Sequence, residues 1–219
     1  MSDTLILLME WIGTTAFAVS GALVAITRGL DLFGVIIVGC ITSVGGGILR
    51  DVLMGQFPPG IFSNVPMLAL AALTSVLVFV FSYRKRYFFE DFKRRLEVIN
   101  NYFDAVGLAV FTVIGVEKAV AAAFGDKFVF AVCMGLLTGV GGGVLRDVLV
   151  DQTPYILKKH VYAVASVAGA VVYYEGRLYL DRTLTLFAAV ALIILLRLLA
   201  TRFRWRLPRI DLDGIKNRK

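Results

Sequence analysis

The chain has 219 residues, of which 58% are hydrophobic, and its 23 lysines and arginines against 16 acidic residues give a formal net charge of +7. A mean hydropathy of +0.81 excludes an ordinary soluble domain and indicates a polytopic membrane protein. Because the positive charge lies at loops and at the C-terminal end, it favours contact with anionic lipid head groups and argues against nucleic acid as a partner.

Apolar stretches of roughly 20 residues are long enough to cross a bilayer as helices. The sequence contains seven of them, at residues 5–26, 32–54, 64–83, 99–116, 128–150, 160–174 and 183–200. The first stretch has acidic and not basic neighbours (Asp3, Glu10), so we expect it to remain in the protein as a span and not to be a cleaved signal peptide. These stretches predict an all-α fold with seven transmembrane helices.

Basic residues predict how the chain is oriented in the membrane. Residues 84–97 contain six lysines and arginines interleaved with aromatic residues, and residues 202–219 contain seven. Cytoplasmic loops carry such an excess of positive charge. Three predicted spans precede the first basic segment and four lie between it and the second, so we expect the N-terminus outside and the C-terminus in the cytoplasm.

Two halves of the sequence resemble each other. Gly-Gly-Gly-Ile-Leu-Arg-Asp at 45–51 recurs as Gly-Gly-Gly-Val-Leu-Arg-Asp at 141–147, and an acid-x2-Gly-x3-Phe-x3-Gly pattern begins at both Glu10 and Asp104. A repeat with an odd number of spans must be inverted in the membrane relative to its partner. We therefore expect a first three-helix repeat at 1–83, a basic interfacial connector at 84–97, a second repeat at 98–176, a seventh helix at 177–201 that packs around the outside, and a basic cytosolic tail at 202–219.

The glycine runs fall late in the second and fifth apolar stretches. Each glycine destabilises a helix by about 1 kcal/mol relative to alanine, so we expect both helices to break or kink there. The freed carbonyl groups of a broken helix can coordinate a cation, and its freed amide groups can meet an anion, if they line water or protein. The alternative is close packing of two helices, which small residues also permit.

An Arg–Asp pair follows each glycine run, Arg50–Asp51 and Arg146–Asp147. Charges at membrane depth are unfavourable by about 2.5–3.5 kcal/mol each on insertion scales, which indicates either a function or side chains that extend to the interface. Because adjacent helical residues do not face each other, we expect each arginine to find its partner elsewhere. Inversion places Arg50 towards the outer face and Arg146 towards the cytosol, where Arg146 is the better candidate for binding a lipid head group.

Hydroxyl side chains precede the glycines by about one turn, at Thr42, Ser43 and Thr138. They could line a polar path for a partly dehydrated potassium ion, or each could donate a hydrogen bond back to its own helix. The predicted pore and gate residues are therefore Gly45, Gly46, Gly47, Gly141, Gly142, Gly143, Thr42, Ser43, Thr138, Arg50, Arg146, Asp51 and Asp147.

Several kinds of enzyme site are excluded by the sequence. The glycine runs lack the Gly-Lys-Ser/Thr of a phosphate-binding loop, and there is no Cys/His cluster for a metal. The single histidine, His160, lies at a membrane edge, and Cys40 and Cys133 are interpreted as small core residues. We expect no enzymatic activity, no metal and no cofactor.

The doubled Gly-Gly-Gly-x-x-Arg-Asp motif, in two inverted three-span units followed by a seventh span, resembles the prokaryotic branch of the trimeric intracellular cation (TRIC) channels, from about residue 5 to residue 200. The resemblance implies a homotrimer in the inner membrane with one pore in each protomer, formed around kinked second and fifth helices. Potassium would permeate, sodium less readily, and Arg146 matches a lipid-binding position of animal relatives. Their fourth-span Lys-Glu-Val is not matched by Glu117-Lys118-Ala119, so calcium or voltage sensing is not implied.

Two other functions remain open at this stage. The same sequence group is also described as a glycine transporter, and half-helix ends would suit the carboxylate and amine of an amino acid. A third possibility is a structural or lipid-interacting membrane protein.

Overall fold

In the computed structural model, residues 2–85, 93–122, 126–158, 161–203 and 205 are described, and every regular element among them is helical. The long helices are α1 (Ser2–Thr27), α2 (Leu32–Leu53), α3 (Val65–Arg84), α4 (Lys93–Ala121), α5 (Phe128–Leu149), α7 (Val161–Tyr179) and α8 (Arg182–Arg202). The short elements are the 3-10 helix η1 (Gly60–Ser63) and α6 (Tyr155–Lys158). The predicted all-α class is confirmed, and among the described residues each of the seven apolar stretches corresponds to one long helix.

Within the described residues, five helices are long and apolar enough to cross a membrane: α1, α2, α3, α5 and α8. Helix α4 carries additional charges, including Asp104, Glu117 and Lys118, and α7 carries Glu175 and Arg177. Length and hydropathy therefore support a polytopic membrane protein, and the count of seven crossings stays a prediction. Residues 86–92 of the connector, His160 and most of the tail, namely 204 and 206–219, lie outside the described residues.

Local signals define the ends of two helices. The Asp31 carboxylate accepts a hydrogen bond from the Gly34 amide at 2.8 Å and caps the start of α2, and Asp181 caps α8 through the amides of Thr183 and Leu184. Gly55 adopts a φ of 71° immediately beyond α2, a conformation that suits glycine. Beyond this turn, the end of α2 contacts η1, the segment that precedes α3.

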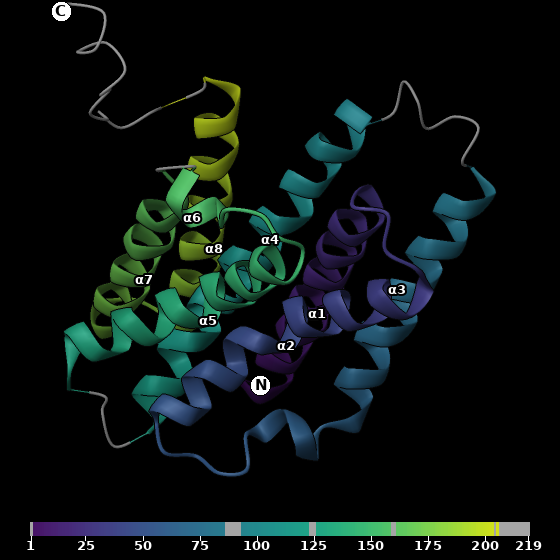
Figure 1. The fold of residues 1–219 in the computed structure, drawn as a ribbon. Helices are drawn as coiled ribbons and strands as arrows, with labels where there is room; N and C mark the ends of the chain where they lie inside the picture. Colours follow the sequence, from purple (N-terminus) through teal and green to yellow (C-terminus); the bar gives the residue numbers. More distant parts are fainter. Residues whose placement is uncertain (1, 86–92, 123–125, 159–160, 204, 206–219) are drawn as a thin grey trace, which may run out of the picture.

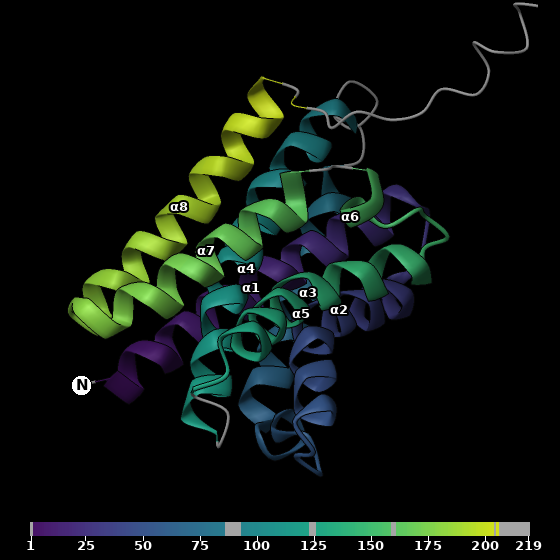
Figure 2. The ribbon, with the colours of Figure 1, turned by 90° about the vertical axis from the view of Figure 1, so that its left-hand side faces the viewer.

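Helices α1 and α4 lie side by side in the centre of the molecule, and α2 and α5 pack on them and on each other (Figures 1 and 2). Helix α3 covers α1 and α2 on one side, and α7 and α8 cover α4 and α5 on the other. All of the functional residues predicted from the sequence lie on two of these four inner helices, α2 and α5.

Glycines and phenylalanines make reciprocal contacts where α1 meets α4. The Phe17 ring packs against Gly107, and the Phe111 ring packs against Gly13, where an added Cβ would lie 3.0 Å from the ring. The two rings stack with their centroids 5.4 Å apart. The acid-x2-Gly-x3-Phe-x3-Gly pattern thus provides the same packing pair twice, once in each direction.

The predicted breaks at the glycine runs are wrong, because α2 and α5 are continuous helices through Gly45–Gly47 and Gly141–Gly143. The two helices cross at these glycines. A Cβ on Gly46 would overlap the Thr138 carbonyl group, and a Cβ on Gly142 would overlap that of Thr42. The partner helix shields the glycine backbone that an isolated helix would expose, so close packing offsets the low helix propensity.

Candidate functional site

A cavity of about 200 Å³ with polar and charged side chains in its wall opens beside this crossing, and we call it the vestibule. Its polar lining comes from α1, α2, the segment after α2, and α4, and consists of Glu10, Thr14, Ser43, Arg50, Asp51, Gln56, Asn64 and Lys118. Apolar side chains, among them Met67, Phe111 and Ile114, complete the wall. Four charged groups thus share one small cavity, two of each sign.

Arg50 is held in the vestibule wall by its sequence neighbour. Its Nε and Nη2 donate to Oδ1 of Asp51 at 2.9 and 2.7 Å, and Oδ2 of Asp51 accepts from the Gly60 amide at 2.9 Å. The expectation that Arg50 would need a distant partner is wrong, because its long side chain bends back near the end of the helix to reach the next residue. Asp51 therefore joins Arg50 to the start of η1.

The second motif forms the same arrangement of hydrogen bonds. Arg146 Nε donates to Oδ1 of Asp147 at 2.8 Å, and Oδ2 of Asp147 accepts from the Tyr155 amide at 2.8 Å, at the start of α6. In both halves the aspartate therefore anchors the arginine and the segment that follows the helix.

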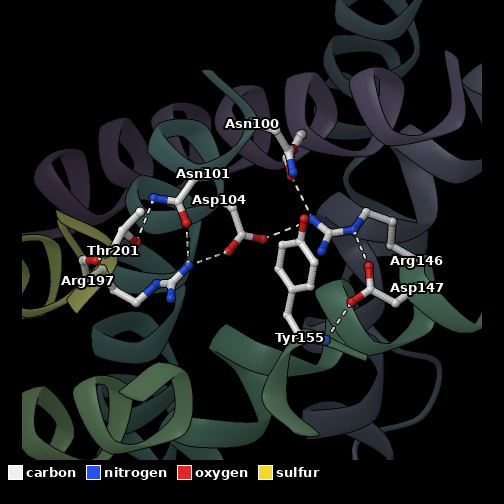
Figure 3. A network of polar contacts seen from close by, with 9 residues as sticks. Asn100, Asn101, Asp104, Arg146, Asp147, Tyr155, Arg197 and Thr201 are labelled. Carbon is white, nitrogen blue, oxygen red and sulfur yellow. Dashed lines mark hydrogen bonds and ion pairs between the residues drawn. The ribbon is translucent and has the colours of Figure 1, made fainter. Parts of the chain in front are cut away.

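Arg146 also lies in a buried ion-pair cluster (Figure 3), and no such cluster surrounds Arg50 in the part of the chain that the structure describes. The Nη1 atom of Arg146 donates to Ser20 Oγ at 2.6 Å and to Asp104 Oδ1 at 2.9 Å. The other Asp104 oxygen lies 3.4 Å from Nη2 of Arg197, which also donates to Asn101 at 3.0 Å. The Arg146 and Asp104 side chains are 0% exposed. We define the cluster as Asp104, Arg146, Asp147 and Arg197, whose formal charges sum to zero, as burial requires.

Comparison with known proteins shows close relatives along nearly the whole chain. The family described as "Glycine transporter" matches residues 7–84 and 101–176. The UPF0126 inner membrane protein YadS of Escherichia coli K12 is 39% identical over 94% of this chain and 96% of its own length. A UPF0126 membrane protein of Vibrio cholerae is 34% identical over 97% of this chain and 85% of its own.

The solved structures that resemble this chain are TRIC cation channels. A prokaryotic TRIC channel crystallised in 0.5 M KCl is similar with a TM-score of 0.83 at 34% identity, covering 94% of this chain and 100% of that chain. A TRIC trimeric intracellular cation channel orthologue from Rhodobacter sphaeroides is similar with a TM-score of 0.81 at 31% identity, covering 92% and 100%.

The chain belongs to the prokaryotic TRIC channel family.

Members of the TRIC family are trimeric cation channels and not enzymes. The family, the membrane class and the non-enzymatic class predicted from the sequence are therefore confirmed. Because the matched family is described as a glycine transporter, transport of a small amino acid stays an alternative function.

The glycines of the two motifs have three different placements. Gly45, Gly46, Gly141 and Gly142 contact the opposite helix at the crossing. Gly47 lines the vestibule instead, whereas a Cβ on Gly143 would lie 3.2 Å from the Tyr162 hydroxyl, beside the buried cluster. The equivalent glycines of the two motifs thus face an open cavity in one half and a closed polar cluster in the other.

The three hydroxyl residues donate back to their own helices. Thr42 donates to the Val38 carbonyl and Thr138 to the Met134 carbonyl, both at 2.6 Å. Ser43 donates to the carbonyl groups of Gly39 and Thr14 at 2.8 and 3.1 Å and also lines the vestibule. A pore role stays a prediction for all three, and Ser43 is the best placed for it.

Sequence reasoning missed the contribution of the last helix. We expected it to pack around the outside, yet α8 inserts Arg197 into the cluster, where its side chain is 2% exposed. The available signal was an arginine inside an apolar stretch, since an intramembrane charge marks a candidate functional residue. The partner was not readable, because Asp104 and Arg197 lie 93 positions apart in the chain.

Proposed function

We propose that this chain is a passive channel for monovalent cations, permeable to potassium, with a pathway inside each protomer of a homotrimer. The observation that carries the proposal is the vestibule at the α2–α5 crossing, lined by carboxylate, amide and hydroxyl groups. These are oxygen donors of the kind that replace part of the hydration shell of a cation, and the solved relatives are cation channels.

We infer that the pathway runs from the vestibule, past the glycine crossing, to the buried cluster. The vestibule is open, whereas the cluster fills the corresponding place of the second half with paired charges. The geometry therefore fits a closed state. Conduction requires the cluster to rearrange. Gly47 lies at the vestibule end of this pathway, and Gly143 lies at the cluster end. Because Arg146 is fully buried, binding of a lipid head group at this residue also requires that rearrangement.

We further propose that the halves are inverted repeats with seven crossings in the inner membrane, N-terminus outside and C-terminus cytoplasmic. The reciprocal Gly–Phe contacts and the two Asp-to-amide ties support the repeat. Under this orientation the vestibule faces outward, since its residues lie near the start of α1 and the ends of α2 and α4. The cluster then faces the cytosol.

One observation favours a second candidate, the uptake of glycine or a similar small amino acid. The vestibule presents basic groups, Arg50 and Lys118, and acidic groups, Glu10 and Asp51, which together complement a zwitterion. The matched family also carries the description "Glycine transporter".

Planar-bilayer recording distinguishes these functions. Purified protein in symmetrical KCl should give unitary currents proportional to voltage, and bilayers treated with a mock purification should give none. Saturable glycine uptake into proteoliposomes without unitary current would contradict the channel and support the transporter. Neither activity, together with specific lipid binding, would support a structural or lipid-interacting role.

A further inference from the structure

An exposed ion pair bridges α1 and α4 inside the vestibule. The Lys118 ammonium lies 3.5 Å from Oε1 of Glu10, and the two side chains are 47% and 23% exposed. Both residues line the cavity. Lys118 belongs to neither repeated motif, and the pair lies outside the closed cluster.

The pair contrasts with the matching acid of the second half. Asp104, which begins the same sequence pattern as Glu10, is 0% exposed and lies between two arginines. The Asp104 carboxylate is thus paired with two buried arginines. Glu10 is balanced by a lysine on a flexible side chain at an open surface, where an ion pair is weak and easily broken.

The other charges of the vestibule balance each other without Glu10. Arg50 donates twice to Asp51, and the second Asp51 oxygen accepts from the Gly60 amide. Glu10 is therefore the carboxylate most able to attract a passing cation. Lys118 decides whether that carboxylate is available.

We propose that the Lys118 ammonium is a tethered internal cation that occupies the Glu10 carboxylate and must be displaced by each permeant cation at the vestibule. The inference rests on the proposed cation-channel function. An ammonium group and a potassium ion carry the same charge and compete for the same oxygens. Lys118 thus sets the local concentration of permeant cation, and with it the conductance at low salt.

The test compares unitary conductance at about 20 mM and about 1 M KCl, since screening removes surface electrostatics at the higher concentration. Lys118→Met should raise the conductance about twofold at the lower concentration by removing the competing charge, and should leave it unchanged at the higher one. Glu10→Gln should lower it at the lower concentration. Lys118→Arg keeps the charge and should behave as the wild type.

A double-mutant cycle separates direct pairing from a general field effect. If Lys118 acts by occupying Glu10, Lys118→Met should change the conductance much less when Glu10 is already Gln. The same fold-change in both backgrounds would overturn the inference while leaving the channel function standing. Absence of wild-type current would contradict both.

The neighbouring Glu117–Arg182 pair provides a matched control. It ties α4 to α8 one residue away from Lys118, and neither of its members lines the vestibule. Arg182→Met should leave the salt dependence of the conductance unchanged. An increase equal to that of Lys118→Met would overturn the assignment of the effect to the vestibule.

Discussion

Arg50 and Arg146 have the same sequence neighbours and different surroundings. Each donates to the aspartate that follows it, yet only Arg146 also holds Asp104 and Ser20. Arg50 is 9% exposed and borders the vestibule, whereas Arg146 is fully buried. Both motifs therefore anchor the segment that follows their helix. Only the second motif also forms part of a buried ion-pair cluster.

Arg146→Ala should destabilise the protein more than Arg50→Ala. Removing Arg146 leaves two buried carboxylates with too few partners, which typically destabilises by about 3–5 kcal/mol. Removing Arg50 leaves Asp51 with the Gly60 amide and an open cavity beside it. The unfolding free energy, measured by SDS titration of the purified protein, checks this difference. Equal losses would show that the cluster contributes no extra stability.

The chemistry of the site could be predicted from the sequence only in part. The glycine and Arg–Asp motifs identified the residues at the crossing and in the vestibule wall. The pairing of Arg50 with its own neighbour contradicted a rule for helix surfaces, which fails where a long side chain bends back at a helix end. Lys118 and Arg197 belong to no repeated motif, so nothing in the sequence linked them to Glu10 and Asp104.

At the scale of elements, the helix positions were predictable and the glycine geometry was not. Predicted stretches 32–54 and 128–150 correspond to α2 (Leu32–Leu53) and α5 (Phe128–Leu149). The stretch 99–116 was too short, because α4 continues through charged residues to Lys93 and Ala121. The break was wrong because helix propensity describes an isolated helix, and tertiary packing overrides it.

The glycines of the first motif should respond differently to alanine. Gly46→Ala places a methyl group against the Thr138 carbonyl and should push α2 away from α5. We expect this overpacking to lower the free energy of unfolding by about 1–3 kcal/mol. Gly47→Ala is the matched control, since a Cβ there would meet only Arg50 Nη2, at 3.8 Å. It should leave stability unchanged or raise it by up to about 1 kcal/mol. Thermal unfolding in detergent compares the two. Similar stabilities of the two variants would contradict the close contact between α2 and α5 at Gly46.

At the scale of the whole molecule, the two halves share a packing scheme and differ in what it encloses. Reciprocal Gly–Phe contacts join α1 to α4, and the glycine runs join α2 to α5. One side of this frame holds an open vestibule and the other a neutral buried cluster closed by α8. Under the proposed channel function, this arrangement corresponds to a pathway that is closed at one end, and conduction would then need a rearrangement at Arg146 and its partners.

The most direct test of this account is the reversal potential of purified protein in a planar bilayer under a KCl gradient, followed by replacement of potassium with sodium on one side. We expect a reversal potential close to the potassium equilibrium value and a smaller permeability for sodium. A reversal potential at the chloride equilibrium value, or a current that appears only with glycine present, would contradict a passive cation pathway through the vestibule.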